Sequence, residues 1–176
     1  MPDFEELFLT LGDGYRAYAR YFAPPRPRGA VLYFHGIQSH CGWYEASARH
    51  LRDAGFAVLQ PDRRGRGRNL EQRGHAASAD QLIRDVWVAR DELLRRAPLD
   101  SFHMLGVSWG GKLVAAAYAV DDARVASLTL VTPGLFPLIG VSAAEKFRIG
   151  IAMVTDPSRL FDIPLNDAEL FTAHAP

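Results

Sequence analysis

Short apolar runs alternate with longer amphipathic runs along most of the chain. Apolar runs without alternation suit strands that are covered on both faces, as in a parallel sheet. Apolar residues at helical spacing between these runs predict amphipathic helices. The predicted strands are 30–34, 56–60, 102–105 and 126–131, and the predicted helices are 43–54, 79–96 and 112–120. This order predicts an α/β domain with a largely parallel sheet.

The pattern differs at both ends of this alternating region. Near the N-terminus, apolar residues in 7–11 and 15–22 flank Gly12-Asp13-Gly14, which predicts a β-hairpin. After Pro133-Gly134 the alternation breaks, and only 143–154 has the spacing of an amphipathic helix. We therefore expect a core over 1–134 and a second region over 135–176.

Composition excludes several classes of function. Twenty basic and twenty acidic residues cancel, so no net charge favours nucleic acid or a membrane surface. The arginine-rich run 63–68 is expected to be a solvated loop face. The single cysteine, Cys41, permits no internal disulfide, and the first residues lack the pattern of a signal peptide. No apolar segment approaches the ~20 residues that span a bilayer. We expect a soluble cytoplasmic protein without a metal or organic cofactor.

The segment Gly106–Gly111 carries the strongest chemical signal. It reads G-x-S-x-G between a predicted strand and a predicted helix. This arrangement is typical of a serine on a sharp turn with an exposed hydroxyl, so Ser108 is the predicted nucleophile. Side chains at Gly106 and Gly110 would crowd such a turn. The following helix directs backbone N–H groups and a partial positive charge at the site.

Two other interpretations of this segment stay open. The first is a glycine-rich loop without chemistry. The second is a phosphate-binding loop, because Gly106–Lys112 also fits G-x-x-x-x-G-K. That motif continues with Ser or Thr to hold Mg²⁺, whereas Leu113 has no oxygen. Nucleotide binding is therefore kept only as a distant alternative.

A second cluster of interest, His35-Gly36-Ile37, lies at the end of the strand 30–34. Ligands of open α/β sheets bind at the carboxyl ends of the strands. The backbone N–H groups of Ile37 and Trp109 are therefore candidate donors to an oxyanion. We expect the ring of His35 to bond to loop backbone, so that His35 positions the loop with Gly36 and is not the base.

Three stretches, in this order, resemble the α/β-hydrolase superfamily, and within it the group of monoacylglycerol lipases, lysophospholipases and serine aminopeptidases. They are His35–His40 with Trp43-Tyr44, Pro61–Arg68, and Gly106–Gly111. The resemblance covers about 8–133 and implies Ser108 as nucleophile, with Ile37 and Trp109 as oxyanion donors. It also implies a structural role for the turn 62–68 and a lid inserted after the strand 126–131.

The chain departs from this family after the nucleophile. The family's triad continues with an acid and then a histidine, each after a later strand. Beyond Ser108 the one histidine is His174, and the acidic residues are Asp121, Asp122, Glu145, Asp156, Asp162, Asp167 and Glu169. No strand is predicted after Val131 to position them. We expect the N-terminal part of a longer enzyme that lacks the C-terminal strands; a triad completed by His174 is the alternative.

The leading functional hypothesis is a serine hydrolase that acts on small-molecule carboxylic esters through an acyl-Ser108 intermediate. An apolar acyl group would suit a pocket lined by Leu135, Phe136, Leu138, Ile139, Val141, Phe147, Ile149, Ile151 and Met153. The same residues could instead pack a lid onto the core, and amide substrates remain open. The second hypothesis is a non-catalytic hydrolase-like module that binds a ligand or partner.

Overall fold

The structure is a computed structural model that describes residues 3–121, 123–135, 142–156 and 159. By its contacts, the chain divides into two compact units, Met1–Leu135 and Phe136–Pro176. The first unit contains the sheet and the Ser108 turn, and it is described first.

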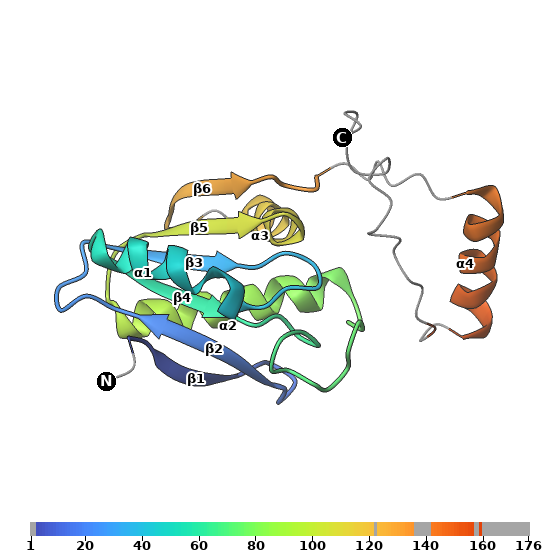
Figure 1. Ribbon diagram of the computed structural model, residues 1–176, viewed down its shortest axis with the longest axis horizontal. Coiled ribbons are helices and arrows are strands. Elements are labelled where there is room, and N and C mark those ends of the chain that lie inside the picture. Colours follow the sequence, from blue (N-terminus) through green and yellow to red (C-terminus); the bar gives the residue numbers. More distant parts are fainter. Residues whose placement is uncertain (1–2, 122, 136–141, 157–158, 160–176) are drawn as a thin grey trace. The chain divides into compact units, whose positions relative to one another are not determined.

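A six-stranded sheet in the order β1-β2-β4-β3-β5-β6 forms the first unit (Figure 1). The pairs β3–β4, β3–β5 and β5–β6 are parallel, whereas β1–β2 and β2–β4 are antiparallel. The strands are β1 Glu5–Thr10, β2 Arg16–Phe22, β3 Gly29–Phe34, β4 Phe56–Pro61, β5 Phe102–Val107 and β6 Val125–Val131. The predicted α/β class, with a mostly parallel sheet and an N-terminal hairpin, is confirmed.

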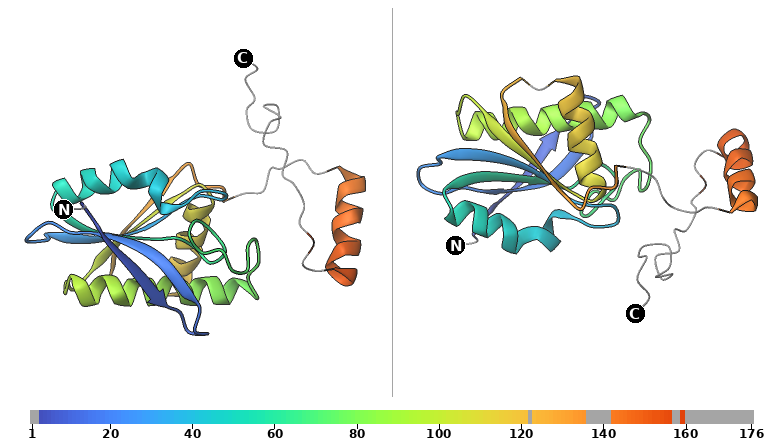
Figure 2. Two further views of the ribbon diagram at one scale, coloured as in Figure 1. Left: turned by 60° about the horizontal axis from the view of Figure 1, so that its bottom comes forward. Right: turned by 90° about the horizontal axis from the view of Figure 1, so that it is seen from above.

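Helices cover both faces of the sheet (Figure 2). The short helix η1 (Cys41–Tyr44) and α1 (Glu45–Asp53) lie on one face, and α2 (Ala79–Arg96) and α3 (Trp109–Val120) lie on the other. The larger core cluster lies between the sheet and the helices α2 and α3. Every residue of β3 is buried, as its continuous apolar run predicts.

Helix α3 begins earlier than the apolar spacing predicts. It starts at Trp109, three residues before the predicted start, and includes Gly110 and Gly111 in its first turn. Glycine destabilises the interior of a helix, so the spacing of the apolar residues predicted a later start for α3. As a consequence, only Ser108 separates β5 from α3.

The expectation of a solvated arginine-rich loop is wrong for two of its residues. Arg63 and Arg64 are 8% and 5% exposed, whereas Arg66 is half-buried and Arg68 is exposed. Both buried arginines follow the end of β4, where the loop folds back against the sheet edge. Partners distant in the sequence explain their burial, as described below.

The second unit contains one described helix, α4 (Ala143–Thr155), at the predicted position. Ser142 and Glu145 form a capping box at its start. Phe147 and Met153 on α4 are exposed. Among the described residues, no helix is both long enough and apolar enough to cross a membrane.

Candidate active site

Ser108 sits alone on a strained turn between β5 and α3. Its backbone has φ 52° and ψ −117°. A positive φ is uncommon for a residue with a side chain, and such strain concentrates at functional sites. The turn is fixed by bonds from Ser108 N–H to Val131 O at 2.9 Å and from Gly111 N–H to Ser108 O at 2.9 Å.

The glycines beside Ser108 are required by close backbone approach. A Cβ on Gly110 would lie 2.5 Å from the carbonyl oxygens of Phe34 and His35. A Cβ on Gly106 would lie 2.6 Å from Gly111 Cα. Real Cβ atoms do not approach other atoms so closely. Both positions therefore require glycine for a structural reason.

The connection is too short to favour a phosphate-binding loop. Such a loop wraps phosphate with several consecutive backbone N–H groups between a strand and a helix. Here β5 ends at Val107 and α3 begins at Trp109, which leaves Ser108 as the whole connection.

The loop after β3 runs beside the nucleophile. A Cβ on Gly36 would lie 3.4 Å from Ser108 Cβ. Three donors converge on the Gly36 carbonyl oxygen: His35 Nδ1 at 2.8 Å, Ser39 Oγ at 3.0 Å and Arg63 Nη2 at 2.7 Å. These bonds fix the plane of the Gly36–Ile37 peptide and polarise it, which strengthens the Ile37 N–H as a donor.

The backbone N–H groups of Ile37 and Trp109 make no hydrogen bond within the described part of the chain. Trp109 is the first residue of α3, where the N–H groups have no partner inside the helix. Both groups are thus available to a ligand. Their role as oxyanion donors remains a proposal.

His35 is fully enclosed, and its ring bonds to loop backbone. Its Nε2 accepts from the Arg63 backbone N–H at 3.1 Å, so the proton of the neutral ring is on Nδ1, which donates to Gly36 O. Burial, and then the nearby Arg63 charge, lower the pKa of His35 to about 4. A neutral ring with both nitrogens engaged is the geometry expected of a loop-positioning histidine.

Arg63 is a site residue that sequence reasoning missed. Its guanidinium lies 4.2 Å from the centre of the Trp109 ring and donates to Gly36 O. It therefore touches both segments that carry the candidate oxyanion donors. The sequence could have indicated Arg63 as a site residue, because it closely follows β4 at the carboxyl edge of the sheet. Its burial, however, depends on the tertiary fold.

The turn after β4 is organised by Asp62. Its carboxylate accepts from Cys41 N–H at 2.7 Å and from Arg68 N–H at 2.9 Å. A Cβ on Gly67 would collide with this carboxylate. The turn also receives Asn69, whose side-chain amide donates to Asp62 O at 2.8 Å. These bonds support the structural role that the family resemblance implies for 62–68.

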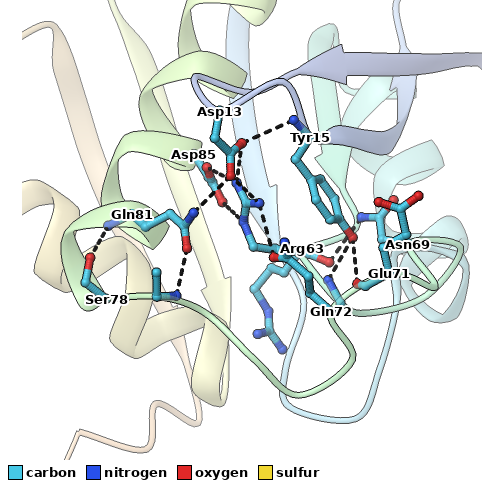
Figure 3. Close-up of polar contacts among 12 residues, drawn as sticks. Asp13, Tyr15, Arg63, Asn69, Glu71, Gln72, Ser78, Gln81 and Asp85 are labelled. Atoms are coloured by element: carbon cyan, nitrogen blue, oxygen red, sulfur yellow. Dashed lines mark hydrogen bonds and ion pairs between the residues drawn. The ribbon is translucent and has the colours of Figure 1, made fainter. Parts of the chain in front are cut away.

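Arg64 joins three parts of the first unit in one ion-pair cluster. Figure 3 labels its two partners, Asp13 and Asp85. Arg64 bonds to Asp13 in the β1–β2 turn at 2.8 Å and to Asp85 on α2 at 3.1 Å. Its side chain is fully buried, and its charge is met by two carboxylates. Arg63, labelled in the same view, directs its guanidinium away from this cluster.

No described residue completes a catalytic triad at Ser108. Within the described part of the chain, the Ser108 hydroxyl makes no hydrogen bond to a histidine, a carboxylate or any other group. His174 lies outside the described residues, as do Asp122, Asp162, Asp167 and Glu169. The described residues also contain no group of three or more His, Cys, Asp or Glu side chains that could hold a metal.

A family model described as "Serine aminopeptidase, S33" matches residues 25–156. The chain belongs to this hydrolase family. The match includes the loop after β3, the turn after β4 and the Ser108 turn. The resemblance stated from the three motifs is thereby confirmed.

The proteins similar to this chain include monoacylglycerol lipases. The chain is 26% identical to a monoglyceride lipase of Mus musculus, over 71% of this chain and 42% of the relative. It is 30% identical to a monoacylglycerol lipase of Mycolicibacterium smegmatis, over 66% of this chain and 41% of that protein. The chain thus spans about two fifths of the length of both lipases.

A solved structure shows the same fold. A thermostable carboxyl esterase of Bacillus coagulans, crystallised with glycerol, superposes with a TM-score of 0.66 at 24% identity. The superposition covers 74% of this chain and 44% of the esterase. Together with the sheet order, it shows that the first unit has the α/β-hydrolase fold.

Proposed function

We propose that this protein is a serine hydrolase that cleaves carboxylic esters through an acyl-Ser108 intermediate. The observation that carries the proposal is the strained backbone of Ser108 between β5 and α3. Its hydroxyl forms no hydrogen bond with any described residue. Strain of this kind is kept where it presents a nucleophile. Membership of the S33 family supports the same chemistry.

In the proposed reaction, Ser108 Oγ attacks the ester carbonyl carbon and gives its proton to a base. The carbonyl oxygen becomes an oxyanion that accepts from the N–H groups of Ile37 and Trp109. The C–O bond to the alcohol then breaks, and the alcohol leaves with the proton. Water releases the carboxylic acid from Ser108 by the same steps.

The base and its orienting acid are the part of this mechanism that the described residues do not supply. A serine hydroxyl without a base is a poor nucleophile, and oxyanion donors alone support only weak catalysis. We therefore expect slow turnover by the 176-residue chain. His174 stays a candidate base because it is the one histidine after Ser108 in the sequence.

The proposed substrates are small esters with an apolar acyl group. The second unit carries exposed apolar side chains on α4, including Phe147, Ile151 and Met153. Such side chains suit contact with a hydrocarbon chain. The lipases to which the chain is similar support an ester substrate.

The test is hydrolysis of p-nitrophenyl butyrate together with labelling by a fluorophosphonate. We expect Ser108→Ala to remove both the turnover and the label. Ser101→Ala is the matched control, because Ser101 is exposed at the other end of β5 and should leave both unchanged. Hydrolysis that survives Ser108→Ala would overturn the mechanism. Robust turnover that His174→Ala removes would identify His174 as the base.

A non-catalytic hydrolase-like module is the second candidate. One observation favours it: no described histidine or carboxylate forms a hydrogen bond with the Ser108 hydroxyl. This alternative predicts no labelling at Ser108 and no turnover of any ester. Ser108-dependent turnover of any ester would exclude it.

A further inference from the structure

A cleft beside the candidate oxyanion segments is lined by positive charge. It has a volume of about 210 Å³, and its lining includes Ile37, Arg63, Arg66, His75 and Trp109. No carboxylate is among the described residues that line it. The cleft thus joins the two segments that flank Ser108 to a cationic wall.

Arg63 is the unusual member of this lining. Arg63 is only 8% exposed. No carboxylate among the described residues forms an ion pair with it. Its Nε makes no hydrogen bond, and of its three nitrogens only Nη2 bonds, to Gly36 O. A buried charge without a counter-charge is costly, so proteins rarely keep one without a function.

The nearby carboxylates form no ion pair with Arg63, although the charge of Asp62 partly offsets the pKa lowering of Arg63. Asp62 accepts from two backbone N–H groups, and Asp13 and Asp85 are bonded to Arg64. Burial, and then the charge of Arg66, lower the pKa of Arg63 to about 10, so it stays charged at neutral pH.

Arg66 adds a second unpaired charge. It is half-buried, and its side chain has no hydrogen bond or ion pair among the described residues. Two guanidinium groups that have no carboxylate partner among the described residues and line one cleft can recognise carboxylate or phosphate oxygens. An ammonium group on a substrate would instead be repelled.

We propose that this cleft binds an anionic group, a carboxylate or a phosphate, on the ester substrate of Ser108. Arg63 and Arg66 would bind the anion, with His75 at the cleft wall, and Ile37 and Trp109 would connect the cleft to the oxyanion site. The assignment rests on the proposed function for its link to catalysis, but the anion site can be measured without turnover.

The first test measures binding on the Ser108→Ala variant, which removes the reaction. Calorimetry with inorganic phosphate, and separately with acetate, should give binding that weakens as KCl is raised. Arg66→Gln should weaken it about fivefold, since one charged hydrogen-bond donor is lost. Arg73→Gln is the matched control, because Arg73 is exposed in the same loop and does not line the cleft.

The second test measures selectivity by the ratio of kcat/KM for an anionic ester to that for a neutral ester of equal length. Mono-p-nitrophenyl glutarate against p-nitrophenyl pentanoate tests the carboxylate, and an acylglycerol phosphate against the acylglycerol tests the phosphate. Arg66→Gln should lower the favoured ratio about fivefold, whereas Arg73→Gln should not change it. Arg63→Lys keeps the charge but loses the planar group, and it should lower the same ratio.

The outcomes separate the two proposals. Anion binding that depends on Arg66, without any turnover, would support the cleft and count against the proposed function. Ser108-dependent turnover with equal ratios in the parent, Arg66→Gln and Arg73→Gln would overturn the cleft and keep the proposed function. Equal phosphate binding by Arg66→Gln and Arg73→Gln would also overturn it.

Discussion

Gly110 is closely packed at the Ser108 turn. Its missing side chain lets the start of α3 approach the end of β3, where a Cβ would meet two carbonyl oxygens at 2.5 Å. We expect Gly110→Ala to lower the free energy of unfolding by about 1–3 kcal/mol, the cost of overpacking. Urea denaturation measures this change.

Gly12→Ala is the control for that substitution. No atom lies within 4 Å of a Cβ at Gly12, and its φ is not positive. Its stability should therefore stay within about 0.5 kcal/mol of the parent protein. Equal stability of the two variants would contradict the close approach of α3 to β3.

The lowered pKa of His35 predicts that the free energy of unfolding depends on pH. Because burial lowers its pKa from 6.5 to about 4, the unfolded chain binds a proton between these values and the folded chain does not. The stabilisation is fully present above pH 6.5 and is lost as the pH falls towards 4, a loss of about 3 kcal/mol.

The measurement is urea denaturation at several pH values between 4 and 7. Carboxylates also titrate there, so the contribution of His35 is the difference in slope between the parent protein and His35→Gln. His50→Gln serves as control, because His50 is exposed on α1. A slope that His35→Gln leaves unchanged would show that the ring is not held neutral.

At the scale of elements, the Arg64 cluster fastens the β1–β2 turn and helix α2 to the turn after β4. Asp85 is only 16% exposed, and burial raises its pKa although Arg64 opposes the rise. Arg64→Met would keep most of the packing and leave Asp85 buried without its partner. We expect a loss of about 3 kcal/mol in the free energy of unfolding.

Arg84→Met is the matched control for Arg64→Met, because it removes an exposed arginine from α2 close to Asp85. It should change the free energy of unfolding by less than about 0.5 kcal/mol. Hydrogen exchange adds a second readout: Arg64→Met should speed exchange in the β1–β2 hairpin and at the start of α2. Unchanged exchange there would mean that the cluster does not hold these elements.

At the scale of the whole molecule, β6 forms an edge of the sheet. Among the described residues it pairs only with β5, and Val131 is 43% exposed. An unpaired apolar edge favours pairing with another chain. We expect the 176-residue chain to self-associate at micromolar concentration, as measured by sedimentation velocity. Thr129→Lys, at an exposed position of β6, should reduce this association, and a parent chain that stays monomeric would contradict the prediction.

Local patterns in the sequence determined the order of the elements, the hairpin and the serine turn. The period of the apolar residues and the order of the motifs are enough to predict these features, because each feature depends on residues close together along the chain. The start of α3 at Trp109 was missed because glycine has low helix propensity. The close approach of Gly110 to the carboxyl end of β3 outweighs that propensity.

Only the tertiary structure decided the burial and the partners of Arg63 and Arg64. Arg63 and Arg64 are adjacent and chemically identical, so no local pattern separates them. The fold brings Asp13 and Asp85 to Arg64, and brings Gly36 and Trp109 to Arg63. One arginine is therefore a structural ion pair and the other is an unpaired charge beside the Ser108 turn, because contacts between distant segments set burial and pairing.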